Sequence, residues 1–230
     1  MKPELFYASM LITEPQKARR ILLAEELENW FMDLFDEEFE DILNGSFKNN
    51  QEAYIDKMVD KYLEITKTSI TANDAYSKVV IDRAFRKASK IQEVTWNNIT
   101  AIPTKNKRND VEDFVDSVKM GIAVSAIIAN SDKIETWLGQ SRANLIALNE
   151  ANWKYNNEEY FEAKAKNKKK IWHTSLDERV RPTHEIMEGV MVDIDEPFNV
   201  GTSQMMFAGD DSLGASESEL DNCRCSTEYK

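Results

Sequence analysis

The chain has 230 residues, a length that allows either one large domain or two small ones. Hydrophobic residues make up 42% and charged residues 30%, which fits a helix-rich globular protein and argues against a disordered or membrane protein. The net charge of -12 argues against a surface that docks as a whole onto nucleic acid, because phosphate binding needs a basic surface. The longest apolar run, residues 121–129, is about half of the roughly 20 residues that cross a bilayer, so we expect no membrane span.

The first long helix is predicted by its two ends. Thr13 and Gln16 have the spacing of a capping box, which predicts a helix start. Apolar residues then recur at steps of three and four from residue 23 to residue 43, and Asn44-Gly45 predicts the end.

The start of the chain, residues 1–4, lacks the basic and apolar pattern of a secretory signal, so we expect a cytosolic protein without disulfides.

Further helices are predicted downstream by the same apolar periodicity. The patterns cover residues 54–63, 75–94 and 111–125, and a last one runs from residue 132 to about residue 149. Each shows one apolar stripe, which is typical of the helices of a bundle. Proline is absent between Pro15 and Pro103 and between Pro103 and Pro182, so the first 165 residues are predicted to form a helical region.

The composition changes near a lysine-rich stretch. Five lysines lie within residues 164–170, and we interpret them as a solvated hinge or helix end; a surface that follows phosphates is the alternative. Beyond it, short apolar pieces at residues 190–192 and 205–207 alternate with glycines and paired acids, which predicts short strands and ordered loops around one or two helices. The predicted fold class is therefore mostly α, with a helical region over residues 1–165 and a small α+β module over residues 166–230.

The segment Glu25–Asp41 is strongly acidic. It holds nine acids and no base, interleaved with aromatic residues. The simplest interpretation is the solvated face of a helix whose other face lies in a core. The alternative is an acidic helix with aromatic edges that docks onto another protein.

All histidines and cysteines of the chain lie in its last 60 residues: His173, His184, Cys223 and Cys225. Two thiolates and two imidazoles would complete a tetrahedral zinc site, and such a site would stabilise a module too small to hold itself together. The alternative is that the histidines make ordinary hydrogen bonds and the cysteines are small buried apolar residues. A disulfide between the two cysteines would be strained.

A second candidate lies around His184. An enzyme would use His184 as a general base oriented by Asp177, with Ser175 or Cys223 as the nucleophile. Asp177 could instead accept hydrogen bonds from Arg179 or Arg181 and order the turn. The chain has no glycine-rich phosphate loop, nucleophile elbow, His-Glu-X-X-His motif or dinucleotide fingerprint, so we expect no enzyme activity.

The C-terminal motifs resemble those of a known family. The order is residues 171–184 (Ile-Trp-His-Thr-Ser-Leu-Asp-Glu-Arg-Val-Arg-Pro-Thr-His), then Met187-Glu188-Gly189, then Pro197-Phe198, and last Asn222-Cys223-Arg224-Cys225. This order resembles the phage Mu F-like minor head proteins, also called phage head morphogenesis proteins. The preceding residues 141–152 look like the family's helix that leads into this module, so the resemblance covers roughly residues 140–230.

The resemblance implies a minor structural protein of a tailed-phage head, with the virion as its final location and the host cytoplasm as its location during assembly. It implies portal protein or major capsid protein as partners, a role in head assembly, genome packaging or delivery, and no established enzyme activity. The chain departs from the family's pattern by a short N-terminal region and by its acidity, which leaves protein docking as a simpler role than DNA contact. The signature positions carried onto this sequence are Trp172, Thr174, Asp177, Arg179, Arg181, His184, Gly189, Cys223, Arg224 and Cys225.

Two other functions stay open at this point. The first is a metal-dependent hydrolase or nuclease that uses His184, Asp177 and the pair Cys223 and Cys225. The second is a toxin or effector whose C-terminal module is a phage-derived packaging signal, although the sequence shows no separate toxin domain.

Overall fold

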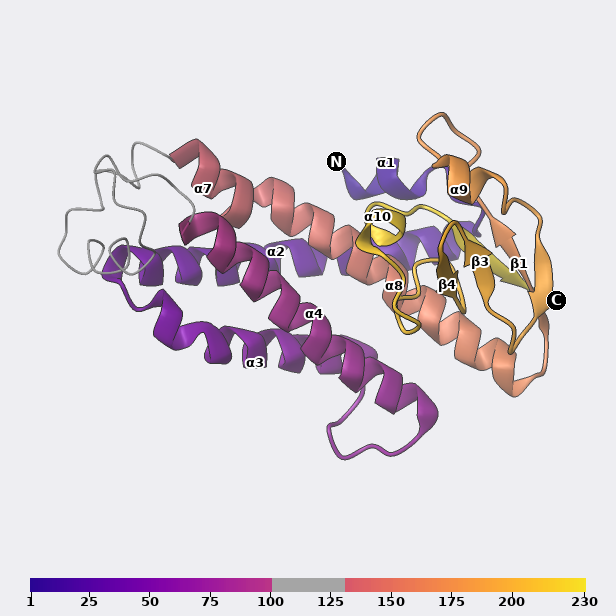
Figure 1. Ribbon diagram of the computed structural model, residues 1–230, viewed down its shortest axis with the longest axis horizontal. Coiled ribbons are helices and arrows are strands. Elements are labelled where there is room, and N and C mark those ends of the chain that lie inside the picture. Colours follow the sequence, from indigo (N-terminus) through magenta and orange to yellow (C-terminus); the bar gives the residue numbers. More distant parts are fainter. Residues whose placement is uncertain (101–130) are drawn as a thin grey trace. The chain divides into compact units, whose positions relative to one another are not determined.

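A computed structural model describes residues 1–100 and 131–230. Within these two ranges, long helices dominate the N-terminal part and short antiparallel strands appear only after residue 168, so the predicted fold class is confirmed (Figure 1). The predicted helix over residues 111–125 lies outside the described residues. The helices before the strands are α1 (Pro3–Tyr7), α2 (Glu14–Asn44), α3 (Phe47–Thr66), α4 (Ala75–Thr100), α7 (Ser131–Leu138) and α8 (Gln140–Ala165).

Helix α2 begins and ends where the sequence predicts. The backbone N–H of Thr13 donates to the side-chain oxygen of Gln16 at 2.8 Å, and the N–H of Gln16 donates to the Thr13 hydroxyl at 3.4 Å. These two bonds satisfy N–H groups that the first turn leaves free. At the other end Gly45 has φ +73°, the left-handed conformation that closes many helices.

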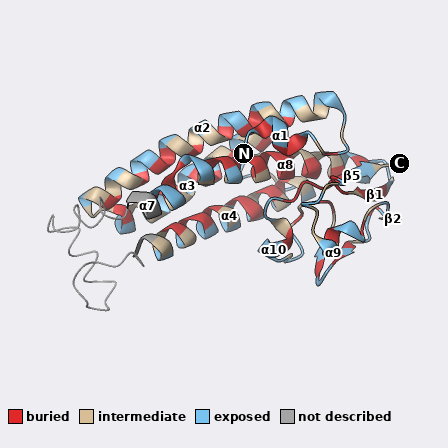
Figure 2. Cartoon of the chain, turned by 90° about the horizontal axis from the view of Figure 1, so that it is seen from above, coloured by how far each residue is buried: buried red, intermediate tan, exposed pale blue. Residues whose placement is uncertain are grey.

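The predicted helix from residue 132 to about residue 149 is two helices, α7 and α8, and its predicted end was wrong. The break falls at Gly139, where a Cβ atom would lie 2.1 Å from the carbonyl oxygen of Glu135. Helix α8 continues to Ala165. Most of its positions from Ala147 to Asn157 are buried, including Asn152, Asn156 and Asn157 (Figure 2). The apolar stripe therefore stops at residue 149 although the helix does not.

The contacts divide the chain into two compact units. One unit combines Met1–Glu28 with Asn144–Lys230, and the other is Asn29–Ala143. The domain boundary predicted from composition, between residues 165 and 166, stays a prediction.

Within the unit of residues 29–143, α3 packs against α4 and α4 packs against α7. The rings of Phe47 and Trp96 stack with their centroids 5.9 Å apart. The acidic stretch of α2 is mostly solvated, as the sequence predicts, with one exception: Glu38 is fully buried and accepts a hydrogen bond from the side-chain amide of Gln92. The exposed acids of the stretch are Glu25, Glu26, Asp33, Asp36, Glu37 and Glu40.

The C-terminal module contains two small sheets. In the first, β1 (Lys169–His173) lies between β2 (Met191–Asp193) and β5 (Ser226–Tyr229), antiparallel to both. The second pairs β3 (Phe198–Val200) with β4 (Ser203–Met205), and two short helices, α9 (Pro182–Glu185) and α10 (Glu217–Leu220), lie in the connections. One core holds the module together: Trp172, Met187, Phe198, Val200, Met205, Ala208, Cys223 and Cys225.

The lysine-rich stretch is not a solvated hinge throughout. Helix α8 ends at Ala165, and Lys169 and Lys170 already belong to β1. Lys170 is fully buried, and its Nζ donates to the carbonyl oxygen of Met206 at 2.7 Å. The prediction holds for Lys164 at the helix end and for Lys166, which are exposed, and was wrong for Lys170.

Among residues 1–100 and 131–230, no helix combines the length and the apolar character that a membrane crossing requires.

Candidate functional site

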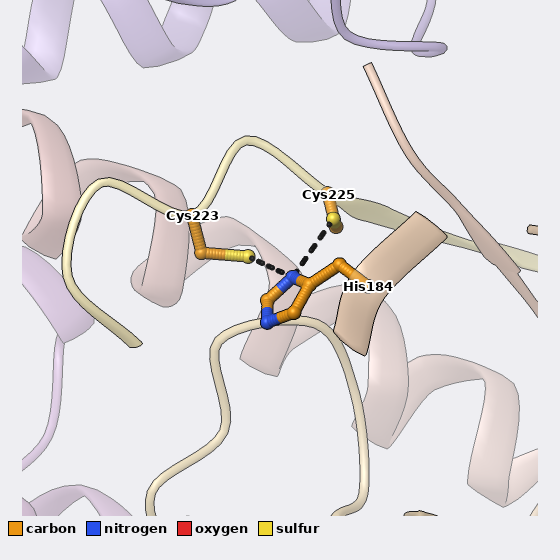
Figure 3. Close-up of side chains that lie close together, drawn as sticks. All are labelled: His184, Cys223 and Cys225. Carbon is orange, nitrogen blue, oxygen red and sulfur yellow. Dashed lines mark hydrogen bonds between the residues drawn. The ribbon is translucent and has the colours of Figure 1, made fainter. Parts of the chain in front are cut away.

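Three side chains converge inside the C-terminal module. His184 lies on α9, while Cys223 and Cys225 lie on the segment between α10 and β5. The Nδ1 atom of His184 is 3.3 Å from the sulfur of Cys225 and 3.6 Å from the sulfur of Cys223. Figure 3 shows the imidazole ring facing both sulfurs. His184, Cys223 and Cys225 expose 1%, 4% and 3% of their surface, so the cluster is closed to solvent.

The other ring nitrogen of His184 is held by a carboxylate. Its Nε2 lies 3.0 Å from Oε2 of Glu219 on α10, and the same oxygen accepts from the Thr183 hydroxyl at 2.8 Å. A carboxylate in this position favours the tautomer whose proton is on Nε2. The Nδ1 lone pair then points toward the two sulfurs.

The pKa values of the two thiols are shifted in opposite directions. The hydrogen bond between the sulfurs lowers the pKa of Cys223 well below its usual range and raises the pKa of Cys225, because one negative charge serves both atoms. Burial alone lowers the pKa of His184, but the hydrogen bond with Cys223 and its charge outweigh burial, and the pKa is raised. The cluster thus favours a thiolate on Cys223, which is the form that binds metal ions.

Helix α8 positions the segment that carries the cysteines. The side-chain amide of Asn152 donates to the carbonyl oxygen of Cys223 at 3.4 Å, and Asn149 accepts from the backbone N–H of Asn222 at 3.1 Å. One turn further along, Asn156 donates to the carbonyl oxygen of Ala208 at 2.8 Å. None of these asparagines was among the site residues predicted from sequence. Their spacing of three and four residues on one helix face was the available signal.

A buried cation orients these amides. Arg20 of α2 is fully buried, and its guanidinium donates to the side-chain oxygens of Asn152 at 3.4 Å and Asn156 at 2.9 Å. With the oxygens engaged, the NH₂ groups are left to donate to the loops of the module. Because their side chains are hydrogen-bonded in this way, polar residues can occupy buried positions of α8.

Asp177 pairs with an arginine that lies between the two cysteines in sequence. Both terminal nitrogens of Arg224 donate to its carboxylate, at 2.5 and 2.7 Å. The predicted contact with Arg179 is also present, through the backbone N–H at 3.1 Å, whereas Arg181 instead donates to the carbonyl oxygen of Asp221. The prediction that Asp177 orients His184 was wrong, because the carboxylate at His184 belongs to Glu219.

His173 lies outside the cluster of His184 and the cysteines. Its Nδ1 is 2.9 Å from Glu188 and its Nε2 is 3.0 Å from Glu228. Glu188 also accepts from the backbone N–H and the hydroxyl of Thr174, at 2.6 and 2.8 Å. The structure therefore brings together three of the four residues predicted as zinc ligands, and it places His173 in a separate network with two carboxylates.

The remaining signature positions shape the module. Trp172 is fully buried and packs edge-on against His184 and Phe198, with ring centroids 5.6 and 5.2 Å away. Gly189 has φ +74°, and its N–H donates to the carbonyl oxygen of Trp172 at 2.9 Å. A side chain at position 189 would be strained in this left-handed turn, which explains the glycine.

Together, the fold and the cluster define a helical protein with a small α+β module built around buried histidine and cysteine side chains. The sequence model for "Phage Mu protein F like protein" matches residues 109–228, slightly more than half of the chain. The chain belongs to this family of phage head morphogenesis proteins, which places it in the virion. No curated protein and no solved structure matched the chain.

Proposed function

We propose that this protein is a minor structural component of a tailed-phage head that binds the portal protein or the major capsid protein during head assembly, genome packaging or delivery. The observation that carries the proposal is the family match over residues 109–228, which covers all but the last two residues of the C-terminal module. Assembly takes place in the host cytoplasm, before the protein enters the virion. The role is structural and involves no catalysis.

The module offers a candidate contact residue for such a partner. Leu176 is 68% exposed and has φ +54°, a conformation that costs a residue with a Cβ roughly 1–2 kcal/mol. The turn around it is anchored by the pair of Asp177 with Arg224. An exposed leucine held in a costly conformation supports a role in recognition, since such strain gathers at functional sites.

A second exposed aliphatic side chain lies in the same stretch of sequence. Ile186, which follows α9 directly, is 73% exposed. Large apolar side chains that bury on binding supply much of the affinity of protein interfaces. Leu176 and Ile186 are therefore the first residues to test for contact with the head.

The first experiment is co-purification of the full chain with the portal protein and, separately, with the major capsid protein of the same phage. Leu176→Asp and Ile186→Asp should each weaken the retained complex at least tenfold. Leu22→Asp is the matched control, because Leu22 is also 68% exposed but lies outside the family match. The proposal fails if the unmodified chain binds neither protein and is missing from purified heads.

Leu176→Gly separates recognition from stability. Glycine tolerates φ +54°, so this change should leave the free energy of unfolding unchanged or raise it by up to about 1 kcal/mol. It should nevertheless weaken partner binding, because the apolar side chain is gone. A variant that binds as well as the unmodified chain would exclude Leu176 from the interface.

The hydrolase or nuclease alternative is less well supported. Asp177 is engaged by Arg224, and His184 is 1% exposed, so neither is free to act on a bound substrate as that mechanism requires. The alternative would be favoured if His184→Gln abolished a measured hydrolysis of DNA or peptide while the melting temperature stayed the same.

A further inference from the structure

In the cluster of His184, Cys223 and Cys225, two sulfur atoms converge on one ring nitrogen, as they would in a metal site. Both sulfurs approach the same ring nitrogen, at 3.3 and 3.6 Å. In the tautomer set by Glu219, that nitrogen has a single lone pair, which accepts one good hydrogen bond. Only one of the two thiols can then donate to His184, and without a metal the other sulfur is held by its hydrogen bond with the first sulfur.

A tetrahedral zinc ion accounts for both contacts. Bonds of about 2.3 Å to sulfur and about 2.0–2.1 Å to nitrogen place the nitrogen about 3.6 Å from each sulfur and the sulfurs about 3.8 Å apart. The ligand atoms of His184, Cys223 and Cys225 all lie within 4.8 Å of one another. The side chains are therefore already spaced as zinc ligands.

The surroundings match those of a zinc ligand histidine. A histidine that binds zinc through one nitrogen usually donates its other N–H to a carboxylate, which fixes the ring and makes it a better ligand. Glu219 takes that role at 3.0 Å and is itself held by Thr183 at 2.8 Å. The indole N–H of Trp172 lies beside this cluster in the core and donates toward the sulfur of Cys225, as it would toward a thiolate ligand.

We propose that His184, through Nδ1, and the sulfurs of Cys223 and Cys225 bind one Zn²⁺ ion. Within the described residues no further histidine, cysteine or carboxylate belongs to this group, so the three side chains supply three of the four positions of a tetrahedral ion. The burial of all three ligands makes the ion structural. It ties α9 to the segment before β5, across 39 and 41 residues of chain.

Zinc binding also gives the module a source of stability. Its strands have three to five residues each, and small sheets of this size are marginal without additional restraint. Closing a loop of about 40 residues lowers the entropy of the unfolded chain. This inference does not depend on the proposed role in head assembly.

The test is the metal content of the full chain, purified under reducing conditions without metal-affinity resin. Elemental mass spectrometry should find about one zinc per chain. His184→Gln should lower this at least tenfold, while His173→Gln, the matched control, should keep it. The chain has only these two histidines, and His173 lies in the separate network with Glu188 and Glu228.

A second measurement covers the case in which His184→Gln does not fold. Zinc is removed from the unmodified chain with a chelator, and Co²⁺ is added. Two thiolate ligands predict a near-ultraviolet charge-transfer band and the strong visible bands of a tetrahedral site, and added zinc should bleach both. Chelation should also lower the melting temperature by about 5–15 °C.

The metal-free alternative is an imidazolium–thiolate pair between His184 and Cys223, with Cys225 as a neutral thiol. A folded, reduced chain without zinc and without a cobalt–thiolate band would establish that alternative and overturn the proposal. Copper or iron in place of zinc would overturn the assignment of the ion. Retention of zinc by His184→Gln together with its loss from His173→Gln would overturn the assignment of the ligands.

Discussion

Both terminal guanidinium nitrogens of Arg224 donate hydrogen bonds to the carboxylate of Asp177, at 2.7 and 2.5 Å. One of these nitrogens also donates to the hydroxyl of Ser9 at 2.8 Å. The Arg224 side chain is only 5% exposed. This pair fixes the turn at residue 177 against the segment that carries both cysteines. The sequence separation of 47 residues between the partners makes it a tertiary contact.

Arg224→Lys should lower the free energy of unfolding by about 1–3 kcal/mol, because a lysine cannot make the two-pronged contact and leaves a partly buried carboxylate less well paired. Urea unfolding followed by circular dichroism measures this. The matched control is Arg179→Lys, whose side chain is 50% exposed and 3.5 Å from Asp177, and which should cost less than about 0.5 kcal/mol. Equal effects of the two changes would contradict the prediction.

The acid dependence of stability should change when Asp177 is replaced. The hydrogen bonds from Arg224 hold the pKa of Asp177 well below its ordinary value of 3.8. The folded state thus binds this proton less readily than the unfolded state, so the pair adds stability above about pH 4 and loses it as the pH falls further. The unfolding free energies of the unmodified chain and of Asp177→Asn should converge between about pH 4 and pH 2. Parallel curves would show that the pair adds nothing that depends on the charge of Asp177.

Glu38→Gln should stabilise the protein above neutral pH. Burial raises the pKa of Glu38 from 4.5 to about 7. The folded state binds the proton more tightly, so stability falls as the pH rises from about 4.5 to about 7, and a neutral amide avoids that loss. One oxygen of Glu38 and the amide oxygen of Gln92 have no hydrogen-bond partner among the described residues, and a glutamine at position 38 supplies a donor there.

The expected gain is about 1–3 kcal/mol at pH 8, measured by urea unfolding. Glu37→Gln serves as the control, because Glu37 is exposed and forms a surface ion pair with Lys57, so its replacement should change stability by less than about 1 kcal/mol. A loss of stability in Glu38→Gln would mean that a charged Glu38 is needed beside Arg142, whose charge also acts on it.

The free energy of unfolding of the unmodified chain should rise with pH in alkaline solution, and Lys170→Met should remove that rise. Burial lowers the pKa of Lys170 from 10.5 to about 8. Between these values the unfolded chain binds more protons than the folded one, so stability rises with pH there. The free energy of unfolding of the unmodified chain, minus that of the variant, should increase by about 1–3 kcal/mol from pH 8 to pH 10.5. Lys169→Met, at an exposed neighbouring position, should follow the unmodified chain, and identical behaviour of the two variants would refute the role of burial.

The ends of α2 could be predicted from sequence because local chemistry decides them. The Thr13 and Gln16 pair and the left-handed Gly45 act within one turn of the backbone. The end of α8 could not be predicted, since the polar face of Asn149, Asn152 and Asn156 resembles solvated helix surface until the partners in the C-terminal module are known. A hydrophobic pattern alone does not distinguish buried amides from exposed ones.

The same distinction holds for the cluster of histidine and cysteines. The order of the motif residues indicated the family from sequence alone, and the concentration of histidine and cysteine in the last 60 residues supplied the candidate ligands of the proposed metal site. The tertiary structure decided which histidine faces the thiols, which carboxylate holds it and which arginine pairs with Asp177. The physical reason is that a β-turn, a helix end or an amphipathic stripe depends on neighbours in the chain. Contacts such as His184 to Glu219 join residues 35 apart and exist only once the strands and loops between them have packed.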